Sequence, residues 1–214
     1  MIKKLIPILL VLAICFSLGG ISAAAAYVGD ADETDPPVYP GETADAEEDV
    51  AAVQTEAADD GLFPEELYLQ QDWRGTCTLC SATMMLRGWL YRHGSDAWQE
   101  VWESDVRQTA WCSEGLYWNW SYTVDGYEMR VAHASVSGIS ADTLEALLEE
   151  HPEGIALYCG RYPHAVFITD VTDGVVYCAD PSGDGRTPID ESILNAYGGQ
   201  SAILRNVTAY WYIT

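Results

Sequence analysis

The sequence predicts an α+β domain in which a helical first half packs on an antiparallel sheet formed by the second half. Apolar residues recur at three- and four-residue spacing between positions 76 and 93, which indicates a helix. Three short apolar runs, at 155–159, 165–170 and 175–179, are separated by short polar turns, which indicates antiparallel strands. Helices followed by strands in one chain are typical of the α+β class.

The first 26 residues have the three parts of a secretory signal peptide. Lys3 and Lys4 supply the positive start, residues 5–18 are almost wholly apolar, and residues 22–26 are small. The apolar run is too short for a stable membrane span, although a retained anchor is the alternative. We therefore expect an exported protein, secreted or held at the cell surface, without stable membrane insertion once the signal is cleaved.

Residues 27–60 form an acidic linker. They contain twelve acidic residues and no basic residue, so they bury too little apolar surface to offset the entropy lost on ordering. We expect this segment to be disordered. Residues 61–214 then fit one domain of ordinary size.

The charge of the chain excludes two classes of partner. The net charge is −23, and the chain beyond the signal keeps eight arginines and no lysine. So acidic a protein repels nucleic acid and anionic lipid, and we expect neither as a partner.

The first half of the domain is expected to contain a docking segment, two helices and a hairpin. Residues 63–69 form a short docking segment, and a helix over 76–93 ends at Gly94. A second, shorter helix is expected over 96–104. The aromatic-rich stretch 111–131 contains Asp125-Gly126 between two strand-like runs, which predicts a hairpin.

The sheet-forming half begins with a helix over 140–150, which Ser140 caps and Pro152 follows. The three predicted strands come next, and Asp173-Gly174 supplies one of their tight turns. A helix is expected over 190–197, with Gly198 at its end, and a final strand over 203–213.

The cysteine count is odd once the signal is removed. Five cysteines remain, and in an exported protein at least one of them has no partner within the chain. The other four could form two disulfides, which the compartment permits. The sequence does not fix the pairing; the five are Cys77, Cys80, Cys112, Cys159 and Cys178.

Cys77 is the candidate nucleophile because it stands at the start of the predicted helix. Unpaired backbone N–H groups and the positive end of the helix dipole favour the reactive thiolate there. Gly75 permits a tight turn and the close approach of a substrate backbone. Gln71, six residues ahead, and the Cys77 backbone N–H are candidate donors to the oxyanion that forms when a thiolate attacks a carbonyl.

A thiolate of this kind needs a base, and His164 is the candidate. It opens a predicted strand and so stands on a rigid element at the rim of the sheet. Asp180 ends the neighbouring strand, in the sequence Asp180-Pro181. The antiparallel arrangement places this carboxylate beside His164, where it would orient the imidazole.

These residues resemble the papain-like cysteine peptidases, with the closest likeness to the branch of bacteriocin-leader-processing, double-glycine peptidases. In that branch a Gln-containing loop leads to a Cys at a helix start, and a strand-opening His precedes an Asp-Pro or Asn-Pro. Gln71, Cys77, His164 and Asp180 match this pattern within residues 63–214.

The resemblance implies a papain-like fold and cleavage of a peptide or protein substrate through a thioester acyl-enzyme, without a cofactor or metal. Cys77 would attack, His164 would take and return the proton, Asp180 would hold the ring and Gln71 would help to hold the oxyanion. Many relatives carry Gly after the nucleophile, where this chain has Thr78, and the transporter-linked members work inside the cell. The sequence therefore does not identify the substrate.

Other functions remain as alternatives. Cys77 and Cys80 form a Cys-x-x-Cys at a helix start, which is typical of thiol–disulfide oxidoreductases. A second alternative is an exported binding module of the same fold with a degenerate site. Asp180 also begins a segment with the outline of a calcium loop, although Pro181 and Pro188 fit it poorly. Zinc binding is disfavoured because a second ligand pair with suitable spacing is missing.

Overall fold

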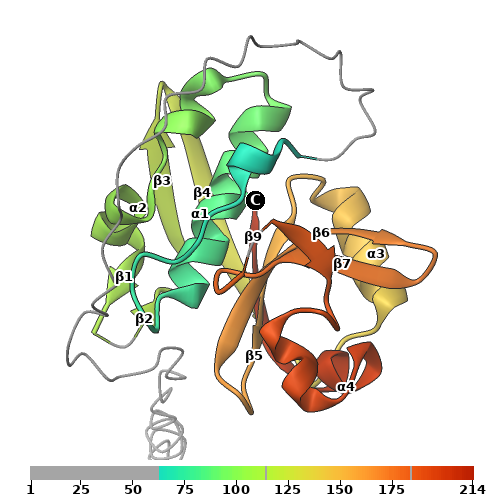
Figure 1. The fold of residues 1–214 in the computed structure, drawn as a ribbon. Helices are drawn as coiled ribbons and strands as arrows, with labels where there is room; N and C mark the ends of the chain where they lie inside the picture. Colours follow the sequence, from blue (N-terminus) through green and yellow to red (C-terminus); the bar gives the residue numbers. More distant parts are fainter. Residues whose placement is uncertain (1–62, 114, 184) are drawn as a thin grey trace, which may run out of the picture.

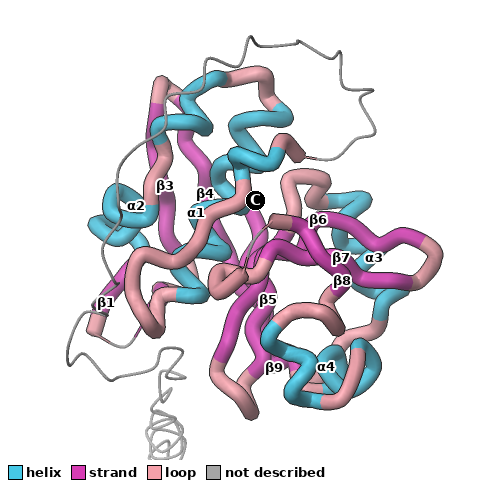
Figure 2. The backbone as a smooth tube through the Cα atoms, in the orientation of Figure 1, coloured by secondary structure: helices cyan, strands magenta, loops and turns pink. Residues whose placement is uncertain are grey.

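The computed structural model describes residues 63–113, 115–183 and 185–214. The main sheet has seven strands in antiparallel pairing, and helices of the first part pack on it (Figures 1 and 2), which confirms the predicted α+β class. The predicted signal peptide and acidic linker lie outside the described residues. Among the residues that the structure describes, no helix is long and apolar enough to cross a membrane.

Helix α1, Cys77–Arg92, forms the centre of the molecule and confirms the helix predicted over 76–93. Every residue from Cys77 to Gly88 is buried, including polar ones such as Thr78 and Ser81. The burial is nearly complete because α1 packs against β5 (Ile155–Cys159) and β6 (His164–Thr172) as well as the helical segments of the first half. Figure 1 shows α1 between the β3–β4 hairpin and the β5–β7 strands.

The large sheet has the order β3-β4-β9-β5-β6-β7-β8, with antiparallel pairing throughout. Both predicted tight turns occur: Asp125-Gly126 and Asp173-Gly174 have positive φ at both positions, as a two-residue hairpin turn of the I′ type requires. The remaining strands are β3 (Trp120–Val124), β4 (Tyr127–Ser135), β7 (Val175–Ala179), β8 (Arg186–Pro188) and β9 (Val207–Ile213). A separate two-stranded sheet joins β1 (Trp111–Cys112) to β2 (Gly115–Leu116).

Strand β5 shows how the sheet divides two hydrophobic cores. Ala156 and Tyr158 belong to the core around α1, whereas Ile155, Leu157 and Cys159 belong to a second core. The second core lies under α3 (Ala141–Glu150) and α4 (Gln200–Arg205). Alternate side chains of a strand point to opposite faces, so a continuous apolar run fits a strand that is covered on both sides.

Three predicted elements differ from the structure. The helix expected over 96–104 is a 3₁₀ turn, η2 (Asp96–Glu100), and a separate helix α2 (Glu103–Ala110) follows it. The helix expected over 190–197 is reduced to η3 (Ile193–Tyr197), and the start of the strand expected over 203–213 belongs to α4. The chain turns at Gly198 and Gly199, which both have positive φ, and this separates α4 from η3.

The remaining predictions for local structure are confirmed. The docking segment contains a 3₁₀ turn, η1 (Glu65–Leu67), and both Phe63 and Leu67 are buried. Ser140 caps α3 by accepting a hydrogen bond from the Thr143 N–H at 3.1 Å.

All five cysteines of the described chain are free thiols, so the two disulfides that the sequence left open do not form.

Candidate active site

Cys77 begins α1 at the point where a loop turns sharply into the helix. Gly75 adopts a φ of 91°, a conformation that favours glycine, and Thr76 follows as the N-cap residue. The Thr76 hydroxyl donates a hydrogen bond to the Trp73 carbonyl at 2.9 Å, which closes the turn. Cys77 is 8% exposed and belongs to the hydrophobic core around α1, so the residue is buried at the start of the helix.

His164 opens β6 on the strand that packs against α1. Its Nε2 lies 2.6 Å from Asp180 Oδ1, in a nearly solvent-free position. Burial alone lowers the pKa of His164, but the hydrogen bond to Asp180 and the interaction with the Cys77 thiol outweigh it and raise the pKa to about 9. The ring therefore carries its proton at neutral pH.

Asp180 follows β7 and is buried. Besides the His164 ring, its Oδ1 accepts from the Ser182 N–H at 2.8 Å and its Oδ2 accepts from the Ile193 N–H at 2.9 Å. Burial raises the pKa of this carboxyl, but the bonds from His164 and the two backbone groups outweigh it and hold the pKa below its usual value. Asp180 is thus an ionised, fixed acceptor for the imidazole.

Gln71 lies in the loop that leads to Cys77 and is tied to the Asp180-Pro181 turn. Its backbone N–H donates to the Pro181 carbonyl at 2.9 Å. Its side-chain Oε1 is buried and makes no hydrogen bond to any described residue. The structure thus joins the Gln71 loop to the turn that carries Asp180, and it brings His164 together with both Asp180 and Cys77.

Glu103, which is not among the site residues predicted from the sequence, lies against the same loop. It is the first residue of α2, is 4% exposed, and its Oε2 accepts from the Asp72 N–H at 3.1 Å. Burial raises its pKa to about 7, although interactions with Thr76, the Asp72 N–H and Cys80 act in the opposite direction. An acidic residue near a tryptophan gives no sign of burial in the sequence, so only the packing of α2 on the loop reveals it.

Cys80 lies one turn along α1 from Cys77 and is completely buried. Its thiol donates to the Leu69 carbonyl at 3.5 Å. Burial, with further contributions from Glu103, Asp72 and Cys77, raises its pKa well above the usual value. Cys80 is therefore a neutral thiol that holds the loop to the helix.

The other histidines stand apart from this constellation. The His93 Nδ1 hydrogen-bonds the Trp89 carbonyl at 2.8 Å, and the His133 ring stacks on Trp118. His151 pairs with Glu153. Each of these contacts is accounted for by local packing.

The calcium-loop outline that begins at Asp180 does not form a helix–loop–helix. The segment continues into β8, and the Asp180 carboxylate is already engaged by His164, Ser182 and Ile193. Across the described ranges, no group of three or more His, Cys, Asp or Glu side chains is arranged to hold a metal ion.

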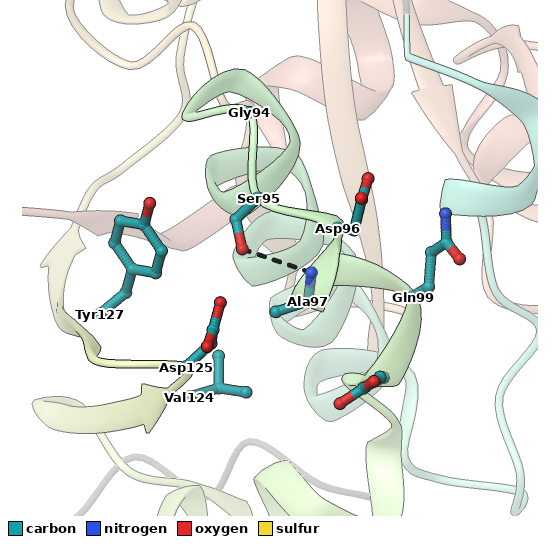
Figure 3. A pocket seen from close by; sticks show the side chains of 9 residues that line it. Gly94, Ser95, Asp96, Ala97, Gln99, Val124, Asp125 and Tyr127 are labelled. Carbon is teal, nitrogen blue, oxygen red and sulfur yellow. Dashed lines mark hydrogen bonds between the residues drawn. The ribbon is translucent and has the colours of Figure 1, made fainter.

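A hollow on the molecular surface lies away from the candidate site. Figure 3 shows it between η2 and the β3–β4 turn, with Ser95, Asp96, Asp125 and Tyr127 in its lining. The Ser95 hydroxyl accepts from the Ala97 N–H at 3.3 Å, so this group caps the 3₁₀ turn. None of the four site residues predicted from the sequence lines this hollow.

Comparisons of the chain with protein-family models, with curated proteins and with solved structures found no match.

Proposed function

We propose that this protein is an exported cysteine peptidase, or a closely related acyl transferase, with a papain-like fold. The observation that carries the proposal is the 2.6 Å contact between His164 and Asp180, beside a helix-start thiol that interacts with the same ring. A nucleophile, a base and a group that orients the base are the three parts of a covalent acyl-transfer site.

The proton path follows from the ring contacts. Asp180 engages Nε2, so Nδ1 is the nitrogen left to exchange a proton with Cys77. The Cys77 sulfur attacks the substrate carbonyl carbon, and a C–S bond forms while the carbonyl π electrons move to oxygen. When the C–N bond breaks, protonated His164 gives its proton to the leaving amine. Water, activated by the neutral ring, then cleaves the thioester and releases the acid.

The oxyanion needs donors that are fixed before the reaction. The Cys77 backbone N–H is at the free N-terminus of α1, where helix N–H groups have no partner within the helix. The Gln71 amide is the second donor that we propose. The Gln71 backbone N–H is bonded to the Pro181 carbonyl, so the backbone that carries this amide is held relative to the Asp180-Pro181 turn.

The oxidoreductase alternative rests on the closeness of Cys77 and Cys80, both free thiols in the first turn of α1. In oxidoreductases the Cys-x-x-Cys helix follows a strand of a βαβ unit. Here a loop containing only the 3₁₀ turn η1 leads from Phe63 to α1, and the large sheet is antiparallel. Redox chemistry also gives no role to the His164–Asp180 pair. The arrangement therefore supports acyl transfer better.

The test is to treat the purified protein with iodoacetamide across a pH range and to map the labelled cysteine. We expect fast labelling of Cys77 near neutral pH and slower labelling in His164→Ala, with Cys112 as the ordinary thiol for comparison. A quenched-fluorescence peptide library then reports cleavage. An inert or disulfide-bonded Cys77, without turnover after mild reduction, would contradict the proposal.

The two alternatives predict other outcomes. Reduction of insulin with dithiothreitol would favour the oxidoreductase. A reactive Cys77 without turnover of any acyl donor would favour the binding module.

A further inference from the structure

We infer that Glu103 is a positioning residue, which fixes the Gln71 loop so that the Gln71 amide stays aimed at the oxyanion. This inference rests on the proposed function, because it gives Glu103 a part in acyl transfer. Glu103 belongs to α2, an element that contributes no other residue to the site.

The placement of Glu103 is unusual for an acidic residue in the first turn of a helix. Such residues commonly stay in solvent, where they interact with the helix dipole. Glu103 is instead 4% exposed and directs Oε2 to the Asp72 N–H, outside its own helix. Its Oε1 is buried and makes no hydrogen bond of normal geometry, although Thr76 and Cys80 lie close enough to lower the pKa of the carboxyl.

The bond from Asp72 completes a clamp on both sides of Gln71. The Gln71 N–H is fixed by the Pro181 carbonyl, and the next N–H along the chain is fixed by Glu103. One anchor therefore comes from the sheet side of the site and the other from the helical side. Two consecutive peptide groups are held, which restricts the rotation of the backbone that aims the Gln71 side chain.

Two weaker contacts hold the loop just before this clamp. The Leu69 N–H approaches Met84 Sδ at 3.2 Å, and the Cys80 thiol donates to the Leu69 carbonyl. Sulfur is a weak hydrogen-bond partner, so the carboxyl oxygen of Glu103 is a stronger acceptor for this loop than Met84 Sδ.

The surroundings of Glu103 disfavour its ionised form. None of the salt bridges in the described chain involves Glu103, and neighbouring Asp72 adds to the rise in its pKa. A buried carboxyl without a salt bridge, beside the loop that leads to the proposed nucleophile, is the pattern expected of a functional group rather than of a stabilising one.

The experiment compares three variants of the full chain. Glu103→Ala removes the acceptor, Glu103→Gln keeps a neutral acceptor, and Asp105→Asn is the matched control in the same helical turn. Two reactions are followed for each: acylation of Cys77 by p-nitrophenyl acetate and alkylation by iodoacetamide. Only acylation forms an oxyanion.

We expect Glu103→Ala to slow acylation by about 10- to 100-fold while alkylation stays within about twofold. Glu103→Gln should recover most of the rate, and Asp105→Asn should match the parent. In a Gln71→Ala background the further loss caused by Glu103→Ala should nearly vanish, because both changes act through one donor. Equal slowing of both reactions, or full additivity with Gln71→Ala, would overturn the inference.

Hydrogen exchange supplies a readout that needs no acyl donor. The Asp72 amide should exchange faster in Glu103→Ala than in the parent or in Asp105→Asn. If the parent chain is not acylated at all, the proposed function fails, while the exchange result still decides whether Glu103 fixes the loop. Unchanged exchange at Asp72 would contradict the clamp whatever the activity.

Discussion

Helix α1 runs between two histidine–carboxylate pairs, each made of a buried carboxylate and a partly buried histidine. His164 and Asp180 lie beside Cys77 at its start. Glu153 lies near its other end, where its carbonyl packs on Gly88 and its carboxyl interacts with His93 and His151. The contact distances are 2.6 Å for His164–Asp180 and 3.4 Å for His151–Glu153.

The difference lies in how each carboxylate is satisfied. Asp180 accepts from the ring and from two backbone N–H groups, and these bonds lower its pKa despite burial. For Glu153, burial is the larger influence and raises the pKa, although His151 and His93 oppose it. Closeness of a histidine to a buried acid is therefore not enough for the role that we propose for His164 and Asp180. The pair must be ionised by fixed donors and must stand next to a nucleophile.

The largest expected effect separates the two histidines by activity. His164→Ala should lower the rate of acylation by p-nitrophenyl acetate by about a thousandfold or more, because the thiol loses the base that we propose for it. His151→Ala should leave the rate within about twofold, because its ring touches Tyr212 and Glu153 rather than the site. Comparable losses in both variants would show that the two pairs do not differ in function.

Substitution of the two carboxylates should change the free energy of unfolding by different amounts, measured by urea unfolding at pH 7. Asp180→Asn should lower the free energy of unfolding by about 1–3 kcal/mol, because it removes a charged acceptor from three bonds. Glu153→Gln should leave it unchanged or raise it slightly, because the neutral amide avoids the burial cost of the ionised carboxyl.

The contributions of Asp180 and Glu153 to the free energy of unfolding should change with pH in opposite directions. The pKa of Asp180 is lowered on folding, so its contribution is present above the unfolded value and is lost as pH falls through the folded one. The pKa of Glu153 is raised, so the parent loses stability relative to Glu153→Gln as pH rises above about 4.5. Parallel pH profiles for the two variants would contradict the comparison.

A smaller effect concerns the highest pH at which the protein stays active. The pKa of His164 is raised from 6.5 to about 9, so the folded ring keeps its proton until pH rises through about 9. Its stabilising contribution is full below 6.5, the unfolded value, and is lost as pH rises from there through about 9. The acylation rate should fall above that value, and Asp180→Asn should move the fall to lower pH. A pH–rate profile checks both shifts, and a fall that stays in place in Asp180→Asn would assign it to another group.

Much of this arrangement follows from local sequence signals. The helix at Cys77, the Asp125-Gly126 and Asp173-Gly174 turns, and the Ser140 cap all combine periodicity with a residue suited to one conformation. The contact between His164 and Asp180 follows from adjacent antiparallel strands, which is why the sequence places the two residues side by side.

The missed elements lacked such signals. Helix α2 has only two buried apolar residues, Val106 and Ala110, and begins after Trp102, which is not a capping residue. Ile203 and Leu204 resemble the start of a strand but face the second core from α4. Glu103 was missed with α2, because its burial depends on how this helix packs against a loop some thirty residues earlier.

The most direct test of the central claim is to look for the acyl-enzyme. The protein is mixed with p-nitrophenyl acetate at pH 7, quenched in acid within the first turnover and digested for mass spectrometry. We expect an acetyl thioester on Cys77 that hydroxylamine removes, and its accumulation should be abolished in Cys77→Ala and strongly slowed in His164→Ala. Acetyl groups found elsewhere, or a Cys77–Cys80 disulfide in place of the thioester, would contradict the role of Cys77 as an acyl-transfer nucleophile.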